Sequence, residues 1–441
     1  MSRTAQAHGE LSPMTAVSAV PPAPPARTLS SAMFTSVEPA TAATGHPVDL
    51  SRALTLGSHT VWPPVVLAPM AGVTNAPFRT LCRRAARSVD APGEEHADAT
   101  RMLFVNEMVM ANALLHRNYK TERIIRFQPD EQPRSLQLYG SDPVVIGEAI
   151  RRLASEGRVD HVDINFGCPA RKVTRRGGGA AVPLKRGLMR NIVRAAVQAG
   201  APHGVPVTLK FRMGVRDDLL TFADTGRIAA DEGAAAIALH ARTAEQHYAG
   251  QARWEAIGEL KAVVGDAIPV LGNGDIWEAS DALTMMAQTG CDGVVVGRGC
   301  LGRPWLFSDL AAVFAGKQCP PPPRLGEVIT VMREHAVALD AWADPGRGVV
   351  EFRKHASWYV TGYPVGGEMR RRLAMVGTLD ELDDLLSRLD PSAEAVPGTN
   401  RVTRGHANGP INVALPDGYL DHLDDDAPPV GDSDAAALSG G

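Results

Sequence analysis

A short β-rich apolar run recurs eight times in the middle of the chain, and a segment compatible with a helix follows each run. The runs span residues 64–69, 101–108, 134–140, 159–166, 205–212, 234–241, 267–274 and 291–299. Strands that alternate with helices indicate βα units and a parallel sheet. Eight such units in roughly 250 residues favour a closed α/β barrel, the (β/α)8 or TIM barrel, over an open doubly wound sheet. No GxGxxG follows the first run, which counts further against a dinucleotide-binding fold.

The regions on either side of the barrel differ from it in composition. Residues 1–60 are rich in Pro, Ala, Ser and Thr and predict a disordered N-terminal extension, whereas residues 61–318 hold the barrel. The proline run at 319–324 resembles a linker, and helical patterning at 325–389 predicts a small all-helical domain over 319–390. Residues 391–441 carry eight acidic residues against two arginines and predict an acidic disordered tail. The polar stretch 87–100 is interpreted as an inserted loop.

Composition excludes some classes of protein. The mean hydropathy is -0.09, and no apolar run approaches the ~20 residues that a membrane span needs. The N-terminus lacks the compact apolar stretch of a secretory signal. The five cysteines are scattered, without CxxC or His/Cys metal spacing, which indicates a reducing compartment. We therefore expect a cytoplasmic protein with no bound metal and no membrane contact. The oligomeric state cannot be read from these features, and a monomer is taken as the expectation.

Positive charge is concentrated in one part of the barrel. The whole chain has a net charge of -4, but residues 164–216 contain eleven Lys or Arg and no Asp or Glu in 53 positions. At average composition such a stretch would hold about six acids. A charge run most often marks a solvated helix face. Because this one spans several elements and loops, it favours a surface that faces a polyanion.

Polar and glycine-rich positions follow the predicted strands, where a barrel of this kind carries its active site. In chain order they are Pro69, Met70, Ala71, Glu107, Gln137, Asn165, Cys168, Lys210, His240, Asn273, Gly297 and Arg298. The segments "LGNGDI" and "VGRG" end the last two strands, and "LGRPWLF" then opens a helix. Loops after strands seven and eight, together with a helix N-terminus, form the usual phosphate site of this fold. Ordinary tight turns are the alternative.

A phosphate there, with the lysine and glutamine of two other strands and a close-packed "APMAGVT", suggests flavin mononucleotide (FMN). A lysine near the pyrimidine end of the flavin would stabilise the negative charge of the reduced ring. The alternative for Lys210 is a salt bridge at the barrel mouth, which we favour less because no acidic residue lies near it in the sequence.

Cys168 stands in "DINFGCPARKVTRRGGGAA", residues 163–181, between a glycine and a proline just beyond a strand. Free cysteine is commonly a small buried apolar residue, and we assign that role to Cys82 and Cys291. A thiol in a loop at the barrel mouth can instead donate a proton to a substrate carbon. Two interpretations of the glycines at 177–179 stay open: a mobile loop over the site, or a plain flexible connection.

Several motifs resemble one known family. "APMAGVTNAPFR", "NEMV", "QLYGSDP", "DINFGCPARKV", "LKFRMG", "LHARTAEQHYAGQARW", "LGNGDI" and "GVVVGRGCLGRPWLF" are similar to the tRNA-dihydrouridine synthases, particularly their DusB-like bacterial branch. The resemblance runs from about Val65 to Leu389. It implies a TIM barrel that binds FMN, takes reducing equivalents from NADPH and reduces specific uridines of tRNA.

The resemblance also implies roles for individual residues. The residues implied to hold FMN are Pro69, Met70, Ala71, Gln137, Lys210, Asn273, Gly274, Asp275, Gly297 and Arg298, with His240 beside the flavin phosphate or ring edge. Cys168 would protonate C5 of uracil after hydride reaches C6, Asn165 would hold the base, and Lys172 and Arg242 would face RNA. The uridine must leave its stack to be reduced, and the basic segment and basic helical domain would offset that cost.

Two other functions stay open from the residues alone. A barrel resembling dihydroorotate dehydrogenase would also combine FMN with a cysteine at its mouth, but it would act on a free pyrimidine and leave the basic helical domain unexplained. A barrel that binds RNA without catalysis would explain the charge but not the cysteine and the flavin set.

Overall fold

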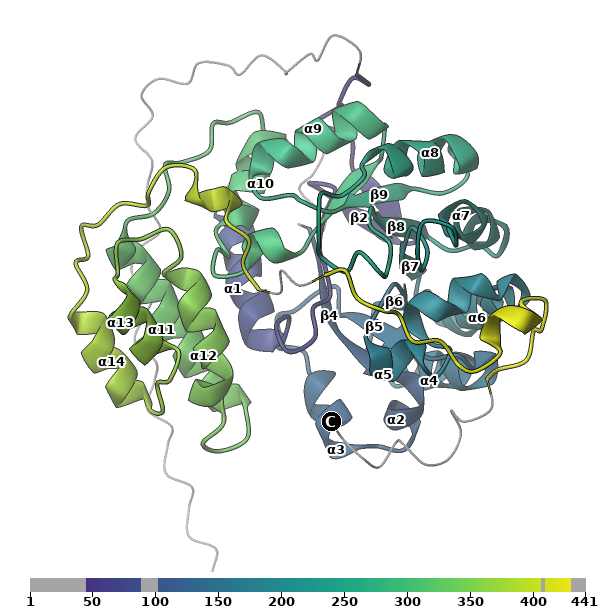
Figure 1. The fold of residues 1–441 in the computed structure, drawn as a ribbon, viewed down its shortest axis with the longest axis horizontal. Helices are drawn as coiled ribbons and strands as arrows, with labels where there is room; N and C mark the ends of the chain where they lie inside the picture. Colours follow the sequence, from purple (N-terminus) through teal and green to yellow (C-terminus); the bar gives the residue numbers. More distant parts are fainter. Residues whose placement is uncertain (1–44, 89–101, 406–408, 430–441) are drawn as a thin grey trace, which may run out of the picture. The chain divides into compact units, whose positions relative to one another are not determined.

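The eight predicted strands form a closed parallel barrel in the order β3 to β10, with β10 pairing back onto β3 (Figure 1). The structure is a computed structural model that describes residues 45–88, 102–405 and 409–429. The strands are β3 (Val65–Leu67), β4 (Leu103–Met110), β5 (Ser135–Tyr139), β6 (His161–Phe166), β7 (Val207–Arg212), β8 (Ala236–His240), β9 (Val270–Asn273) and β10 (Gly293–Val296). The predicted TIM barrel is confirmed.

Helices follow the strands and cover the outside of the barrel (Figure 1). They are α1 (Ala76–Arg87), α2 (Ala111–Leu115), α3 (Tyr119–Ile124), α4 (Pro143–Ser155), α5 (Arg171–Thr174), α6 (Arg186–Gly200), α7 (Phe222–Asp231), α8 (Glu255–Val264), α9 (Ala279–Thr289) and α10 (Leu306–Phe314), with 3-10 turns η2 (Gly179–Leu184), η3 (Ala201–His203) and η4 (Arg298–Cys300). Local signals set several starts. Asn75 and Asp142 cap α1 and α4 by accepting hydrogen bonds from backbone N–H groups, and a proline follows each cap.

Side chains alternate between the two faces of each strand, so the barrel has an outer and an inner core. Val65 and Leu67 pack outward against the helices, whereas Val66 faces the interior with Leu103 and Val295. The inner core is completed by an antiparallel hairpin, β1 (Leu54–Leu56) and β2 (His59–Val61), which supplies Leu54, Leu56 and Val61. The expectation of disorder up to residue 60 is therefore wrong from residue 45 onward, because this hairpin buries apolar side chains inside the barrel.

The predicted all-helical domain is present as α11 (Leu325–Trp342), α12 (Gly348–Tyr359), α13 (Gly367–Leu373) and α14 (Leu379–Ser387) around their own apolar core. It contacts the barrel at α1, where Phe78 lies 5.6 Å from His335 and 5.8 Å from His355 between ring centroids. Lys354 of α12 donates a hydrogen bond to the carbonyl of Gly72 in the β3–α1 loop. The helical domain is thus joined to the loop that begins the predicted flavin site.

The predicted disordered tail is wrong for residues 391–405 and 409–429, which have defined contacts. Arg404 is 4% exposed, and Arg401 in η5 (Thr399–Arg401) forms an ion pair with Asp281 at 2.7 Å. Tyr419 in η6 (Tyr419–His422) is 5% exposed. Scattered apolar residues among the acids supply this burial. The polar insertion 87–100 falls almost entirely outside the described residues, as do residues 1–44 and 430–441. In the described ranges no helix is both long and apolar enough to cross a membrane.

Candidate active site at the mouth of the barrel

Polar side chains point inward at the carboxyl ends of neighbouring strands, and the register of the barrel sets them beside one another. The register pairs at this end are Gln137–Asp163, Asn165–Lys210, Arg212–His240 and His240–Asn273. Residues two apart on a strand share a face, so polar residues at alternate positions of one strand all point inward, as Asp163 and Asn165 do on β6. Parallel strands alone therefore bring residues from five βα units to one opening.

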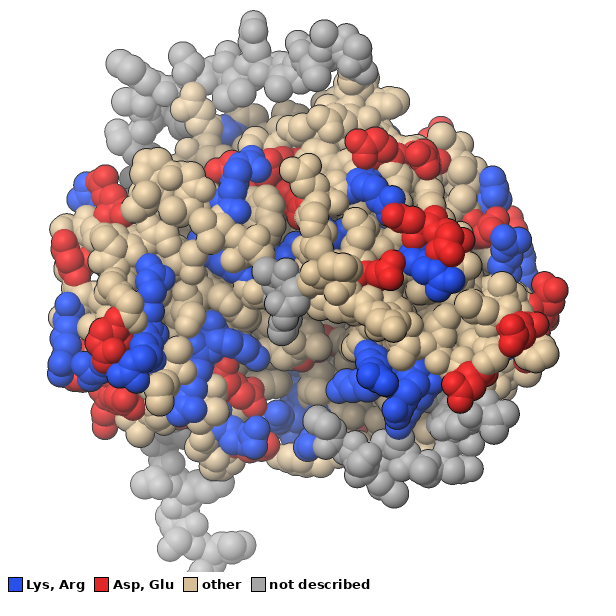
Figure 2. Space-filling model, viewed as in Figure 1, with Lys and Arg blue, Asp and Glu red and all other residues tan. Residues whose placement is uncertain are grey.

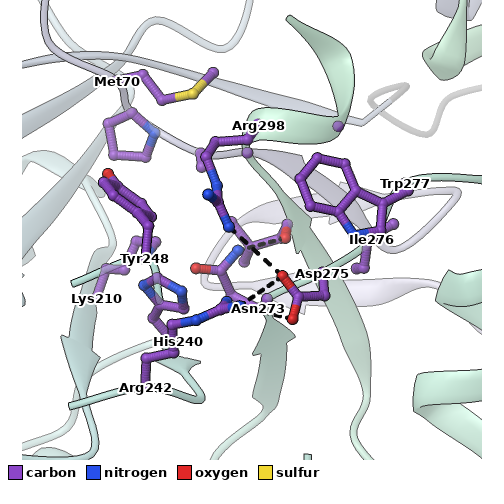
Figure 3. A pocket seen from close by; sticks show the side chains of 16 residues that line it. Met70, Lys210, His240, Arg242, Tyr248, Asn273, Asp275, Ile276, Trp277 and Arg298 are labelled. Carbon is purple, nitrogen blue, oxygen red and sulfur yellow. Dashed lines mark hydrogen bonds and ion pairs between the residues drawn. The ribbon is translucent and has the colours of Figure 1, made fainter. Parts of the chain in front are cut away.

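A pocket opens between β3, β7, β8, β9 and β10, and Figure 3 shows its side chains converging. Of the residues expected to hold a flavin, it brings together Pro69, Met70, Lys210, His240, Asn273, Gly274, Asp275, Gly297 and Arg298. The strand-end glycines lie at the pocket wall as expected. The helix expected in "LGRPWLF" is present as α10, but it starts at Leu306, which does not line the pocket, and η4 beginning at Arg298 precedes it.

Asp275 organises the cations of this pocket. Its two carboxylate oxygens accept hydrogen bonds from Arg242 at 2.9 and 2.8 Å, and one also accepts from the N–H of Ala252 at 2.7 Å. Arg298 lies 3.6 Å from the same carboxylate (Figure 3). Asp275 has a positive φ of 55°, a conformation that Asp tolerates better than most residues. One acid thus orients two arginines toward the pocket.

Positive charge exceeds negative charge in and around this pocket. Burial and mutual repulsion lower the pKa values of its basic residues. Burial, helped by the neighbouring Arg212, lowers the pKa of Lys210 to about 8. Burial lowers the pKa of Arg212 to about 10. Burial and the surrounding cations also hold the pKa of His240 well below its ordinary value, so the imidazole is neutral at pH 7. A bound anion would relieve this repulsion, because an opposite charge favours the charged forms of Lys210 and Arg212.

The residues fit the phosphate-bearing flavin that the resemblance implies. Nη1 of Arg242 is buried and has no hydrogen-bond partner within the described ranges, and leaving such a donor unpaired is costly. A Cβ on Gly274 would come within 2.6 Å of Ala252, and one on Gly299 within 2.1 Å of the carbonyl of Ile276. These glycines let the backbone line the pocket closely. A ligand phosphate would satisfy the unpaired guanidinium nitrogen.

Cys168 and Asn165 do not line this pocket, but the cysteine loop is linked to it through Arg212, whose guanidinium lies 5.6 Å from the ring centroid of the pocket residue Tyr248. The backbone of this loop is held on several sides. Oδ1 of Asn165 accepts hydrogen bonds from the N–H groups of Gly167 at 3.0 Å and Cys168 at 2.8 Å. The Nε of Arg212 donates to the carbonyl of Gly167 at 3.0 Å, and the N–H of Ala180 donates to the carbonyl of Cys168 at 3.1 Å. The predicted base-binding residue Asn165 therefore also sets the turn that carries the thiol.

The thiol of Cys168 is kept protonated. Burial raises its pKa, and the charges of Arg212 and Lys172 offset part of that rise. A group that stays protonated above neutral pH is suited to give a proton rather than to attack as a thiolate. Cys82 and Cys291, which we expected to be buried apolar residues, are indeed 0% and 4% exposed.

The barrel interior below the pocket holds a polar network that the sequence analysis missed. Asp163 accepts hydrogen bonds from Gln137 and Thr208, each at 2.6 Å, and Gln137 in turn accepts from Asn165 at 2.8 Å. Asp163 lines the same interior cavity as Lys210, and burial raises its pKa to about 6. No acid lies near Lys210 in the sequence, but the adjacent strand β6 brings Asp163 near it in space.

Gln137, which we expected to hold the flavin, is 1% exposed and does not line the pocket, because both ends of its amide bond to this network. Ala71 is exposed on the β3–α1 loop, outside the pocket.

Arg242 is placed differently from expectation. It is 1% exposed and lines the pocket, where the carbonyl of Gly250 accepts from it at 2.7 Å, so it does not form an outer RNA-facing surface. Its ion pair with Asp275 draws it inward. Lys172, by contrast, is exposed on α5, immediately after the cysteine loop. Of the two predicted RNA contacts, one therefore lies inside the mouth and the other on its rim.

Three further residues of the mouth were not singled out from the sequence: Arg212, Tyr248 and Trp277. The guanidinium of Arg298 lies 4.4 Å from the ring centroid of Tyr248 and 5.4 Å from that of Trp277. Arg212 is 5% exposed and donates to the carbonyls of Thr243 and His247. Arg212 ends "LKFR", two residues after Lys210, so strand alternation would have placed it on the same face. Tyr248 and Trp277 lie in loops, where periodicity carries no such signal.

Together the fold and the pocket define a TIM-barrel protein with a cationic site and a protonated thiol at the carboxyl ends of its strands. A family model described as dihydrouridine synthase matches residues 66–394, and the chain belongs to the dihydrouridine synthase family. The family predicted from the motifs is confirmed.

Curated relatives agree with this assignment. The chain is 52% identical to a probable tRNA-dihydrouridine synthase of Mycobacterium tuberculosis (strain CDC 1551 / Oshkosh) over 390 residues, 88% of this chain and 98% of that protein. It is 36% identical to tRNA-dihydrouridine synthase B of Xanthomonas axonopodis pv. citri (strain 306) over 315 residues, 71% of this chain and 89% of that protein. A histamine dehydrogenase structure from Rhizobium sp. 4-9 covers 78% of this chain and 65% of its own, with a TM-score of 0.47 and 10% identity, too weak a likeness to bear on function.

Proposed function

We propose that this protein is an FMN-dependent tRNA-dihydrouridine synthase, in which Cys168 donates the proton that completes reduction of a tRNA uridine. The observation that carries the proposal is the pairing of a protonated thiol with a cationic pocket at one barrel mouth. Family membership supplies the reaction class. The named activity of the relatives supplies tRNA as substrate, and a cytoplasmic location is part of the proposal.

The residues of the mouth have different roles in this proposal. Arg242, Arg298 and the backbone at Gly297 would hold the phosphate of FMN, and Lys210 would lie toward the ring that becomes negative on reduction. A flavin held by these residues would supply the hydride for C6 of uracil, with NADPH as the proposed source of its electrons.

Cys168 completes the reduction at the other carbon of the double bond. The thiol gives its proton to C5 and becomes a thiolate, which regains a proton from solvent. Asn165 keeps the thiol in place through the two backbone N–H groups of its turn. Because the thiol pKa is raised, the proton is present on Cys168 at neutral pH before the substrate arrives.

RNA would approach over exposed positive charge near the cysteine. Figure 2 shows basic side chains gathered over α5, where Arg171, Lys172 and Arg175 are exposed. None of these three has an ion pair with an acid of the described part of the chain, whereas Arg186, Arg190 and Arg194 of α6 pair with acids of α7 and its end. Phosphate contacts from α5 would help offset the few kcal/mol lost when a uridine leaves its stack.

The test compares Cys168→Ala with Cys319→Ala, a change at an exposed cysteine in the interdomain linker. Each FMN-loaded protein is incubated with NADPH and tRNA lacking dihydrouridine, and the product nucleoside is measured by mass spectrometry. We expect Cys168→Ala to keep its flavin absorbance and to lose about a hundredfold or more in rate, the usual contribution of a general acid. Cys319→Ala should match the unchanged protein.

Full activity in Cys168→Ala would remove the proton-donor role. A flavin-loaded protein that reduces or oxidises free pyrimidines but forms no dihydrouridine in any tRNA would contradict the proposed substrate.

A further inference from the structure

The C-terminal segment, residues 409–429, lies over the loops of the barrel mouth although the family match ends at residue 394. The N–H of Ile411 donates to the carbonyl of Glu245 at 2.8 Å in the loop after β8. Further along, Tyr419 and Leu423 pack with Ala181 and Leu184 in a separate apolar cluster. Figure 1 shows the segment running across the barrel strands to the side of α6.

Tyr419 is the anchor of this contact. Its side chain is 5% exposed, and Nζ of Lys185 lies 5.0 Å from its ring centroid while pairing with Asp425 at 3.2 Å. Its hydroxyl donates to the carbonyls of Gly177 and Ala181 over 3.5 and 3.3 Å, distances that make these hydrogen bonds weak. The buried ring therefore contributes more to the contact than the hydroxyl does.

The turn that Tyr419 contacts is the one that packs on Cys168. Gly177 and Gly179 have positive φ values of 73° and 55°, so both positions favour glycine. A Cβ on Gly177 would lie 3.1 Å from the Tyr419 ring, and one on Gly179 would lie 2.6 Å from the carbonyl oxygen of Cys168. The glycines are thus a packed turn with the cysteine on one side and the C-terminal segment on the other. This packing does not fit the interpretation as a plain flexible connection, and the mobile loop stays a prediction.

From these contacts we propose that Tyr419 is a positioning residue for Cys168, holding the turn at residues 177–184 against the cysteine loop so that the thiol stays at the barrel mouth. The inference rests on the proposed function for its catalytic consequence, but the positioning itself does not depend on it. A loop with three glycines has few side-chain contacts of its own, so an external apolar anchor reduces the conformations available to it.

An opposing role for the same segment is competition with RNA, because the segment carries five aspartates. The contacts favour positioning. Asp425 pairs with Lys185, and a Cβ on Gly187 would meet Asp426, so both acids lie at the start of α6. Arg171, Lys172 and Arg175 of α5 make no ion pair with the described aspartates of the segment. The exposed charge expected to meet RNA is therefore left uncovered.

The first experiment measures hydrogen exchange in the full-length FMN-loaded protein. Tyr419→Ala, Tyr419→Phe and the control Leu420→Ala, whose side chain is 38% exposed on the same 3-10 turn, are compared. We expect peptides covering residues 177–187 to exchange about tenfold faster in Tyr419→Ala and to be unchanged in Tyr419→Phe and Leu420→Ala. Unchanged exchange in Tyr419→Ala would overturn the proposal even if the enzyme proves inactive on every tRNA tested.

The second experiment separates positioning from RNA binding. We expect Tyr419→Ala to lower kcat by about tenfold or more, because a misplaced catalytic group is costly, with KM for tRNA changed less than about threefold. Tyr419→Phe should restore kcat. A lower KM with kcat unchanged or raised in Tyr419→Ala would overturn the proposal in favour of competition with RNA. Loss of activity in Cys168→Ala, measured separately, tests the proposed function without involving Tyr419.

Discussion

At the residue scale, Lys210 shows how its neighbours set a side chain's chemistry. Burial and Arg212 lower its pKa to about 8, and Asp163 offsets part of that effect. Lys210 is therefore still mostly protonated at neutral pH, and a bound anion would raise its pKa. Lys210 lines both the pocket and the interior cavity that Asp163 also lines, so this residue lies between the acid and the proposed cofactor site.

We predict that Lys210→Met weakens FMN binding by about tenfold to a hundredfold, the range expected for losing one charge-assisted hydrogen bond. Methionine keeps the length of the side chain without its charge. Equilibrium dialysis of the apoprotein with FMN measures the change, and Lys317→Met, in the segment after α10, is the control. Equal affinities in the two variants would remove Lys210 from the flavin site.

The raised pKa of Cys168 predicts how its reactivity and the turnover of the enzyme depend on pH. Its pKa is raised from the ordinary thiol value of 9.0 by burial, so the reactive thiolate is scarcer at pH 7.5 than in a small thiol. Alkylation of Cys168 by iodoacetamide, followed by peptide mass spectrometry, should be slow at neutral pH and still rising above pH 9. Turnover, which needs the protonated thiol, should fall over the same range. A rate of alkylation that levels off below pH 8 would contradict the assignment of Cys168 as a proton donor.

At the scale of single elements, the basic residues of α5 and α6 differ within the acid-free segment 164–216. Those of α6 form ion pairs, whereas those of α5 form none with acids of the described residues. Sequence composition suggested one basic surface, but the cations of α6 are neutralised by Asp224, Asp231 and Glu232 of the following βα unit. The basic surface available to a polyanion is therefore smaller than residues 164–216 suggested. It lies on α5, immediately after the cysteine loop.

Replacing Lys172 and Arg175 by glutamine should raise KM for tRNA and reduce the dependence of log KM on log salt by about one for each phosphate that is no longer neutralised. Arg194→Gln, at a residue paired with Glu232 at 2.9 Å, is the matched control and should leave the salt slope unchanged. Steady-state kinetics between 50 and 200 mM salt, roughly the range in which such interactions weaken most, gives both slopes. A changed slope in the control alone would move the RNA surface to α6.

At the scale of the whole described chain, the helical domain and the barrel meet through close backbone contact as well as side chains. Gly302, in the loop after β10, has a φ of 64°, and a Cβ there would lie 2.4–2.6 Å from backbone atoms of Trp358 and Tyr359 in α12. Gly316 has a similar φ of 67° but nothing within 4 Å of its Cβ position. Alanine substitutions at these two glycines therefore distinguish the cost of backbone strain from the cost of disturbing the interdomain packing.

Gly316→Ala should lower the free energy of unfolding by about 1 kcal/mol, the cost of a left-handed alanine. Gly302→Ala should cost a further 1–3 kcal/mol or so, because the loop and α12 must move apart. Thermal unfolding measures both changes. If the two variants unfold at the same temperature, the packing of the loop on α12 contributes nothing to stability.

Much of the fold and part of the site could be predicted from the sequence for reasons that are local. Eight apolar runs, their helical partners and the polar residues after each run all follow from short periodicities, and the motifs placed Cys168, Lys210 and Asp275 at strand ends. Closure of the barrel then brings those ends together. Arg212 was within reach of the same reasoning, because it stands two residues beyond Lys210.

Only the tertiary structure decided which distant groups meet. Barrel register paired Asp163 with the strand of Lys210, turned Arg242 inward to Asp275, and let a hairpin from residues 54–61 fill the interior. Chain folding beyond the family match placed Tyr419 against the turn behind Cys168. The sequence determined the elements and the chemistry at their ends, because those depend on neighbouring residues. The contacts between segments far apart in the chain depend on three-dimensional closure, which local patterns do not record.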